Sequence, residues 1–506
     1  MNDDAAPPDQ SAEQPSDLRA LVAIDLGAES CRVSMLRWIN GHPHIEVVHR
    51  FSNAPIVIAG SFHWDIEGIE SGVIEGLKNC AQLAPEGIRS IDVDGWAVDY
   101  VRLDASGAAI GPPFCYRDER TIAAESKAHR FFSAGAMRRI TGVQIMRINT
   151  VYQLFADEPH VRRHRWLNLP EYILHRLGGR PVSEFTNATH TQLIDLATRA
   201  WSQEIASALD LDLATFPELV QPGSDLGQLG GPLATFAAFR QTRLIAPACH
   251  DTASAITGIS DRGDNWAYIS SGTWSLVGTL LDASINNELA RAENFTNLGA
   301  AGDRICIHKN VNGMWLIKQC IVTWAAVGLF TMQELIAEAE CLPAPTFLLE
   351  VDEPDLLLPG DMPSRINAQL ICRNLKPFSS GLKDAPAIAS LIFHSLAARY
   401  AEVLEKIATI TGKRLERIHI VGGASKNTFL NRLTAQRTGL EVIAGSPESA
   451  TLGNFAVQLA TLEQAKPATE GPTRLGAGRH QVSNWASALA LTSSHISSAV
   501  TKSKQR

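Results

Sequence analysis

The sequence has no CxxC pair, no zinc-type cysteine spacing and no uninterrupted run of about 18 apolar residues. Its eight cysteines stand alone between positions 31 and 372, which is typical of free thiols in a reducing cytoplasm. These absences argue against a disulfide scaffold and against a zinc module. We predict a cytoplasmic protein without a membrane segment, in which the cysteines are packing residues.

The common glycine-rich signatures of nucleotide binding are also missing. The chain contains neither GxxxxGK[ST] nor GxGxxG. In those motifs the glycine loop leads from a strand into a helix and places phosphate at the helix N-terminus. Any phosphate-binding loop in this chain must therefore be of another kind.

Acidic and basic residues are nearly balanced. The chain has 45 Lys and Arg against 53 Asp and Glu, which gives a formal net charge of −8 over 506 residues. This balance does not favour a nucleic-acid partner, but it is compatible with a small phosphate ligand. The length and an apolar content of 45% predict two or three globular domains.

The two ends of the chain differ in composition from the body. Residues 1–19 are rich in Asp, Pro and Gln, and residues 493–506 are polar. Neither segment carries enough apolar side chains to form a core. We therefore predict a disordered tail at each end of a folded body.

A strand–turn–strand unit occurs twice in that body. Residues 20–24 form an apolar run that reaches a turn at Gly27, and residues 31–38 are again strand-like. The same arrangement returns at residues 266–281 around Gly272. Two such units predict a structural duplication, with paired α/β domains and a ligand between them.

Helices accompany these strands. A long amphipathic helix over residues 388–407 is expected to end before Gly412, and a strand at 418–421 then runs into Gly422-Gly423. We place the domain boundary near residues 255–262. An earlier helix has Asp65 as its candidate N-cap, and its predicted buried face carries Ile66, Ile69, Val73, Ile74 and Leu77.

Three glycine turns are candidate contacts for a nucleotide. Asp25 to Ser30 combines a carboxylate at a strand end with Gly27, which admits backbone N–H groups to phosphate oxygens; such a carboxylate could hold hydrated Mg²⁺. An ordinary hairpin with a solvated Asp is the alternative. Ser271-Gly272-Thr273 offers a second cradle. Gly422-Gly423 could admit a flat adenine or ribose, although glycine pairs also serve plain turns.

Asp251, in the segment His250-Asp251-Thr252-Ala253, has two readings. It is a good N-cap for a helix of small residues. It could equally be a general base, held close enough to an alcohol to accept its proton as a phosphoryl group arrives. The two roles do not exclude each other.

A candidate sugar-binding segment follows the strand-like residues 91–93. Residues 94–100, DGWAVDY, place carboxylates around Trp96, and sugars need both an aromatic face and hydroxyl acceptors. Core packing of Trp96 is the alternative. Asn310 could equally cap a turn or bind a hydroxyl.

Taken together, these motifs resemble the FGGY family of carbohydrate kinases. The resemblance covers nearly the whole folded body, and HDTASA with SSGTWS is its most specific part. The matching segments, in chain order, are IDLGAESCRV, HWDI, DGWAVDYVRLD, YRDERT, NTVYQL, TNATHTQL, CHDTASA, SSGTWSLVG, KNVNGMWL, IHIVGGASKN and SATLGN.

The resemblance implies two actin-like, ribonuclease-H-like ATPase domains, residues 20–257 and 258–480, with ATP and Mg²⁺ in a central cleft. Within the family, the sequence is most similar to members that transfer the γ-phosphoryl group to the 1-hydroxyl of L-rhamnulose. Matching positions make Asp251 the base and Asp25 a ligand of Mg²⁺ through water. The expected nucleotide contacts are Ala28, Glu29, Ser30, Cys31, Arg32, Thr273, Lys318 and Gly423. The expected sugar contacts are Ala97, His250, Asp251, Thr252 and Asn310.

The sequence departs from the family pattern at several of these positions. Cys31 and Ala97 each replace a glycine, Ala424 ends a run that is often three glycines, and Lys318 stands where a glutamine can occur. Each side chain adds atoms where the backbone could otherwise approach a ligand. At Cys31 this affects phosphate binding, and at Ala97 it affects which sugar fits. L-fuculose or a pentulose therefore remains an alternative substrate, and a non-catalytic actin-like ATP-binding module remains an alternative function. We expect a monomer or a homodimer.

Overall fold

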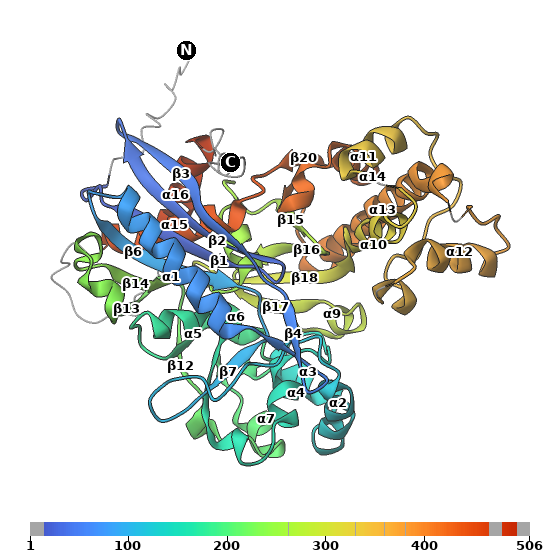
Figure 1. The fold of residues 1–506 in the computed structure, drawn as a ribbon. Helices are drawn as coiled ribbons and strands as arrows, with labels where there is room; N and C mark the ends of the chain where they lie inside the picture. Colours follow the sequence, from blue (N-terminus) through green and yellow to red (C-terminus); the bar gives the residue numbers. More distant parts are fainter. Residues whose placement is uncertain are drawn as a thin grey trace, which may run out of the picture.

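The computed structural model describes residues 15–492 apart from 262, 329, 359, 380 and 465–477. The chain folds into two lobes, each built on a six-stranded mixed sheet (Figure 1). The tails predicted at 1–19 and 493–506 lie outside the described residues, except for 15–19. In that stretch Asp17 is ion-paired with Arg19 at 2.7 Å.

The N-terminal lobe contains the first sheet, in the order β13-β14-β6-β1-β2-β3. β1 is central and runs parallel to β6, while β2 and β3 continue from it as an antiparallel meander. The strands of this sheet are β1 (Ala20–Leu26), β2 (Ser30–Ile39), β3 (His42–Ser52), β6 (Ile88–Gly95), β13 (Ser224–Gln228) and β14 (Arg243–Ala246).

The C-terminal lobe repeats this plan in the order β17-β18-β16-β15-β19-β20. β15 takes the place of β1: it is parallel to β19 and antiparallel to β16. The predicted duplication is therefore confirmed in the topology. The strands are β15 (Trp266–Ser271), β16 (Trp274–Leu281), β17 (Thr296–Ala300), β18 (Arg304–Asn312), β19 (Arg417–Val421) and β20 (Glu441–Ala444).

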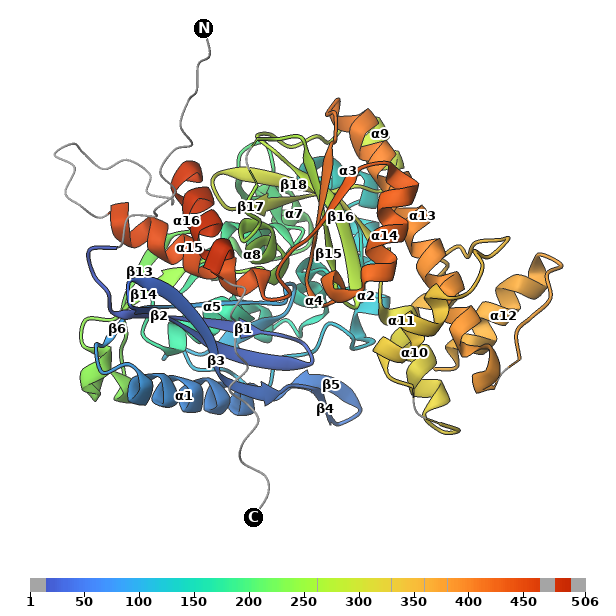
Figure 2. The same ribbon diagram turned by 90° about the horizontal axis from the view of Figure 1, so that it is seen from above.

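Among the described residues four two-stranded sheets and the helices complete the lobes. Figure 2 shows how the helices lie around the two large sheets. The short strands are β4 (Pro55–Ile58), β5 (Ser61–Trp64), β7 (Tyr100–Leu103), β8 (Arg165–Asn168), β9 (Val182–Glu184), β10 (Ile194–Asp195), β11 (Ala200–Trp201) and β12 (Glu218–Val220). The helices of the N-terminal lobe are α1 (Ile66–Leu83), α2 (Arg120–Phe131), α3 (Ala134–Thr141), α4 (Thr150–Ala156), α5 (Leu169–Arg176), α6 (Phe185–Thr189), α7 (Gln203–Ala208) and α8 (Asp251–Thr257). They are followed by α9 (Glu288–Ala292), α10 (Trp315–Trp324), α11 (Met332–Glu340), α12 (Met362–Cys372), α13 (Ala385–Thr411), α14 (Thr428–Thr438), α15 (Ser449–Gln464) and α16 (Arg479–Thr492).

α1 begins as the sequence predicts, because the Asp65 carboxylate accepts a hydrogen bond from the Gly68 N–H at 3.0 Å. The predicted buried face is wrong at one residue. Ile74 is 37% exposed, whereas Val73 and Leu77 are buried. The helix packs against the sheet through a narrower stripe than the sequence suggested, and Ile74 lies at the edge of that stripe.

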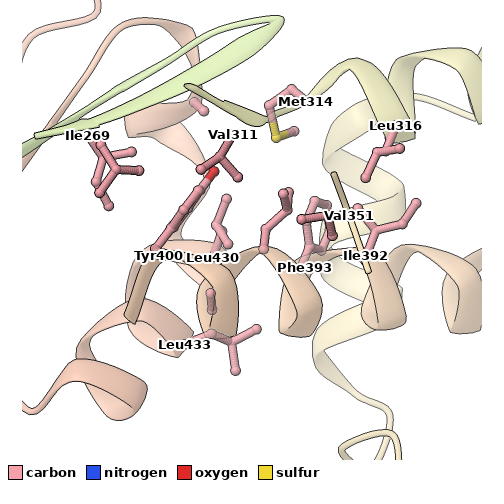
Figure 3. Packing of buried hydrophobic residues seen from close by; sticks show 14 of the residues in the cluster. Ile269, Val311, Met314, Leu316, Val351, Ile392, Phe393, Tyr400, Leu430 and Leu433 are labelled. Atoms are coloured by element: carbon pink, nitrogen blue, oxygen red, sulfur yellow. The ribbon is translucent and has the colours of Figure 1, made fainter. Parts of the chain in front are cut away.

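α13 is the main helix of the C-terminal lobe core, and it ends at Gly412 in the left-handed conformation, as predicted. Tyr400 points from it toward Val311 of the sheet, and Phe393 lies beside Val351 (Figure 3). By length and hydropathy this helix could cross a membrane, but 72% of its apolar window is buried inside the protein. Its apolar surface is therefore used for packing.

The cysteines follow the prediction only in part. Six of the eight are buried, and all eight are free thiols. Cys341 and Cys372 are exposed, so the expectation that every cysteine packs in a core is wrong at these two positions. Both stand at the C-terminal ends of short helices, α11 and α12, where the chain turns back toward solvent.

The two lobes are joined where the chain crosses between them, after α8 and again before α15. α15 returns to the N-terminal lobe, where Leu452 and Phe455 pack against Leu21 of β1. α8 and α15 cross so closely that a Cβ added to Gly453 would lie 2.0 Å from the carbonyl oxygen of Ser254. This crossing fixes the position of Asp251, the first residue of α8.

We expect Gly453→Ala to lower the free energy of unfolding by about 1–3 kcal/mol, because the new methyl group overlaps backbone in a packed crossing. Gly135→Ala is the matched control, since Gly135 of α3 is exposed and an added Cβ there meets only the end of Arg139 at 3.6 Å. That change should be neutral or slightly stabilising. Denaturant unfolding measures both variants. Equal stabilities would contradict the close crossing.

Candidate active site

The carboxyl end of β1 carries the first candidate phosphate loop. In the sheet register Asp25 lies opposite Arg32 of β2 on one side and Asp94 of β6 on the other. The Arg32 guanidinium forms ion pairs with Asp25 and with Glu448, which lies just before α15. Carboxylates from β1 and from the residue before α15 therefore meet at the Arg32 guanidinium of β2, beside the loop.

The loop itself is closed by Gly27. A Cβ added there would lie 2.4 Å from the carbonyl oxygen of Ser30, so only glycine allows this turn. The neighbouring Cys31 is completely buried, its thiol faces the Gly27 carbonyl oxygen at 3.8 Å, and burial raises its pKa to about 12. The Cys31 side chain thus packs into the N-terminal core, which leaves only its backbone for a ligand.

The second candidate loop lies in the corresponding place of the other lobe. The carbonyl oxygens of Gly272 and Thr273 accept hydrogen bonds from the N–H groups of Met314 (3.1 Å) and Trp315 (3.2 Å), at the start of α10. Gly422 packs under this loop with a positive φ of 83°, and an added Cβ would lie 2.9 Å from the Ser271 carbonyl oxygen. The β15–β16 turn and the end of β19 are thereby held together.

Gly423 differs from its neighbours, because an added Cβ there would meet no atom within 4 Å among the described residues. Its backbone therefore faces open space, as a nucleotide contact requires. The next residue, Ala424, is 5% exposed and belongs to the core of the C-terminal lobe. The third glycine that the family often has is replaced here by a residue that packs inward.

Two contacts join the lobes across the loops. The Lys318 ammonium of α10 lies 3.5 Å from the Glu29 carboxylate in the first loop, and both side chains are largely exposed. Asn310 of β18 donates to the Gln144 side-chain oxygen at 3.3 Å. Lys318, Glu29 and Asn310, which were predicted from separate motifs, are thus all at the boundary between the lobes.

Asp251 has one anchored and one open carboxylate oxygen. Oδ1 accepts hydrogen bonds from the Thr252 N–H (2.5 Å) and the Thr252 hydroxyl (3.2 Å), and His250 Nε2 lies 3.3 Å away. Within the described part of the chain Oδ2 accepts no hydrogen bond, and the side chain is 39% exposed. The anchored oxygen fixes the carboxylate, and the open oxygen can accept a proton.

The surroundings of Asp251 make it a better base than an ordinary carboxylate. Desolvation and the Asp25 carboxylate raise the pKa of Asp251 to about 7, against the opposing effects of the Thr252 hydrogen bonds and Arg32. A base with a pKa near the working pH is the most effective proton acceptor that is still ionised. The N-cap of α8 is His250, so the N-cap reading of Asp251 is wrong. The position and the pKa of Asp251 suit the general-base reading, which stays a prediction.

Asp94 adds a second buried carboxylate near the carboxyl ends of β1 and β6. It is fully buried, and burial together with Asp25 raises its pKa well above the usual value. No donor among the described residues lies at hydrogen-bonding distance of either oxygen, although the Asn454 amide is near enough to lower the pKa. A buried carboxylate that lacks donors can be satisfied by a cation or by a proton.

These oxygens suit a hard cation. Among the described residues no three His, Cys, Asp or Glu side chains are grouped closely enough to hold a metal ion. Mg²⁺ does not need such a cage, because it keeps several waters and binds through one or two carboxylates plus phosphate oxygens. Asp25, with Asp94 behind it, fits that mode of binding.

The candidate sugar segment is organised by Asp99. Its fully buried carboxylate accepts hydrogen bonds from the indole N–H groups of Trp64 (2.6 Å) and Trp96 (3.0 Å) and from the Gln153 amide (3.0 Å). The two indole rings lie 4.5 Å apart. Trp96 is 7% exposed. Most of its surface therefore packs in the core, as the alternative interpretation expects.

The remaining sugar candidates gather around this segment. The Gly95 N–H donates to the Cys249 carbonyl oxygen at 3.0 Å, which brings the loop of Ala97 beside His250 and Asp251. Val98, directly after Ala97, has a positive φ of 71°. Ala97 itself is 8% exposed. Its methyl group therefore packs mostly against protein and leaves little surface for a sugar.

A cavity of about 1100 Å³ also opens beside the two segments that join the lobes, after α8 and before α15. Its walls come from β3, residues 258–261, β19 and residues 441–449. None of the predicted nucleotide or sugar residues lines it. It adjoins the first loop through Glu448, whose carboxylate is paired with Arg32.

Comparison with known proteins gives the family. Residues 20–258 match the N-terminal domain, and residues 267–462 the C-terminal domain, of the FGGY family of carbohydrate kinases. The chain belongs to this family. It is therefore a carbohydrate kinase, and the resemblance seen in the motifs is confirmed.

Relatives and solved structures agree with this membership. A rhamnulokinase of Enterococcus faecalis is 37% identical over 456 residues, which cover 88% of this chain and 90% of the relative. A rhamnulokinase of Bacteroides thetaiotaomicron is 34% identical, with 88% and 91% covered. The crystal structure of a ligand-bound xylulose kinase from Lactobacillus acidophilus has a TM-score of 0.71 at 17% identity, with 94% of this chain and 97% of that chain covered. The FGGY fold of two actin-like domains is thus confirmed.

Two partners of the candidate site residues were not predicted from the sequence. Glu448 and His190 lie far along the chain from Arg32 and His250, which they contact, and no local pattern marks them. Asp94 and Asp99 belong to the segment DGWAVDY, but their buried positions were not predicted. Asp94 stands near the end of the buried strand β6, as Asp25 does in β1, and the carboxyl ends of parallel strands meet at one edge of a sheet, so this pair could have been predicted.

Proposed function

We propose that this kinase transfers the γ-phosphoryl group of ATP to the 1-hydroxyl of L-rhamnulose, giving L-rhamnulose 1-phosphate in the breakdown of rhamnose. The observation that carries the chemistry is the Asp251 carboxylate, with Oδ1 anchored, Oδ2 open and the first candidate phosphate loop beside it. The choice of sugar is supported by the two rhamnulokinases that match nearly the whole chain.

The nucleotide would lie between the two glycine turns. Backbone N–H groups from Ala28 to Arg32 and the Thr273 loop would hold the phosphates, Gly423 would admit the adenosine, and Lys318 would meet the phosphate chain from α10. Asp25 would hold Mg²⁺ through water, and the ion would neutralise charge on the β- and γ-phosphates.

The sugar would lie between the Ala97 loop and Asn310, with its 1-hydroxyl at Asp251 Oδ2. Asp251 accepts the hydroxyl proton while the alkoxide oxygen attacks the γ-phosphorus and ADP leaves. Positioning and charge stabilisation supply most of phosphoryl-transfer catalysis. A well-placed base contributes about 10²–10⁴-fold in addition. Thr252 would fix the base and contact the sugar.

A kinase for another ketose and a non-catalytic ATP-binding module are the two alternatives, and one assay separates both from the proposed function. We expect a panel of ketoses to stimulate ADP release from ATP most with L-rhamnulose and less with L-fuculose and pentuloses. The reason is the similarity to rhamnulokinases over nearly the whole chain. A coupled ADP assay measures this directly. Greater stimulation by another ketose would overturn the choice of sugar, and thermal stabilisation by ATP without turnover on any ketose would favour a non-catalytic module.

Asp251→Asn should lower kcat by about 10²–10⁴-fold, because the amide cannot accept the hydroxyl proton. ATP should still bind with nearly wild-type affinity, since its predicted contacts come from other loops. Steady-state kinetics and calorimetric titration with ATP measure the two effects. Asp210→Asn is the control, since Asp210 is an exposed carboxylate in a turn outside the site. Unchanged turnover in Asp251→Asn would rule out the base.

The pH dependence should show the raised pKa of Asp251. The base must be ionised, and its pKa is raised to about 7, so activity is present above that pH and is lost as the pH falls through it. We expect kcat/KM for the sugar at pH 6 to be about one tenth of its plateau. A rate profile between pH 5.5 and 9, with folding checked at each pH, tests this. A flat profile down to pH 5.5 would contradict it.

A further inference from the structure

Three side chains form a continuous row that begins behind the candidate base. His190 follows α6, and its Nε2 lies 3.0 Å from Nδ1 of His250. The two imidazole rings are 3.9 Å apart, centre to centre. His250 Nε2 in turn lies 3.3 Å from Asp251 Oδ1. His250 Nδ1 therefore forms a hydrogen bond with His190, and His250 Nε2 faces the Asp251 carboxylate.

The chemistry of the groups favours one placement of the protons in this row. A carboxylate oxygen 3.3 Å from Nε2 favours the His250 tautomer that carries its proton on Nε2, because in the other tautomer a lone pair would face the negative charge. Burial lowers the pKa of His250 to about 3 and that of His190 well below its usual value, so both rings are neutral. A neutral imidazole protonated on Nε2 has an acceptor at Nδ1. His190 must then donate its own Nε2–H to His250.

Other ionisable groups face this row from the neighbouring elements. His308 of β18 lies close enough to disfavour charge on both imidazoles, and its Nδ1 lies 3.0 Å from the hydroxyl of Tyr268. Asp25 and Arg32 face Asp251 from the first phosphate loop. Asp94 also senses the Asp251 charge. Within the part of the chain that the structure describes, none of these groups forms a hydrogen bond with a ring nitrogen of His250.

We propose that His190 is a positioning residue for phosphoryl transfer: its Nε2–H fixes the tautomer of His250, whose Nε2–H then holds Asp251 Oδ1 and leaves Oδ2 free for the sugar hydroxyl. This proposal rests on the proposed function of Asp251 as the base. No proton moves along the row during the reaction. The proton of the hydroxyl goes to Asp251 Oδ2 and stays there until the product leaves.

Loss of the His190 donor would free His250 to take the other tautomer. The lone pair of His250 Nε2 would then face the Asp251 carboxylate, and one anchor of Oδ1 would become repulsive. Thr252 would still hold the carboxylate by its two hydrogen bonds, so the base would be misplaced rather than removed. Small misplacements at a reacting centre cost about 10²-fold in rate.

Two variants of His190 separate this role from simple packing. His190→Leu fills similar space without a donor, whereas His190→Gln keeps an amide N–H that can reach His250 Nδ1. We expect kcat of His190→Leu to fall about 10- to 100-fold, with KM for ATP and the melting temperature close to wild type. His190→Gln should retain activity within about threefold of wild type. Equal losses in both variants would overturn the proposal.

The tautomer itself can be read without any substrate. In ¹⁵N-histidine-labelled wild-type protein, His250 should give the nitrogen shifts of the Nε2–H tautomer, assigned by their loss in His250→Asn. In His190→Leu the same signals should move toward the Nδ1–H tautomer. A wild-type His250 protonated on Nδ1 would refute the proposal. Because this measurement needs no sugar, it decides the role of His190 even if L-rhamnulose is not the substrate.

Discussion

The proposed chemistry depends on the anchoring of one oxygen of one carboxylate. Asp251 is the first residue of α8; two donors from Thr252 hold its Oδ1, His250 Nε2 lies 3.3 Å from it, and Oδ2 stays open. Without that asymmetry the carboxylate would be one more negative charge beside the first candidate phosphate loop. With it, one oxygen is held and the other is free to accept a proton. Desolvation and the nearby Asp25 carboxylate raise the pKa of the group, which would make it a stronger base.

The duplicated fold explains how the parts of the site meet. β1 and β15 occupy equivalent central places in their sheets, and each delivers a glycine turn at its carboxyl end. The crossing of α8 and α15 connects the lobes through small residues and leaves little room for adjustment. The Lys318–Glu29 and Arg32–Glu448 ion pairs add contacts beside the first candidate loop. A kinase must exclude water during transfer, and the proposed base stands at the start of a helix in this tight crossing.

Much of this could be predicted from the sequence, and what could not be predicted has a physical reason. Apolar runs and turn residues gave β1, β2, β15, β16 and the end of α13, because local preferences and tertiary packing agree there. The motif drew attention to Asp251, although it could not separate an N-cap from a base, and the structure places the N-cap at His250. The exposed Ile74 and the roles of Asp99 and His190 depend on which segments pack together. His190 and His250 are 60 residues apart, so no local pattern could join them.

The most direct measurement is a crystal structure of the kinase with L-rhamnulose and a non-hydrolysable ATP analogue. The account predicts that Asp251 Oδ2 lies about 2.6–3.2 Å from the 1-hydroxyl oxygen of the sugar, in line with the γ-phosphorus, while Oδ1 keeps its contacts with Thr252 and His250. A complex in which the Asp251 carboxylate turns into the protein, more than one water molecule from any sugar oxygen, would contradict the account.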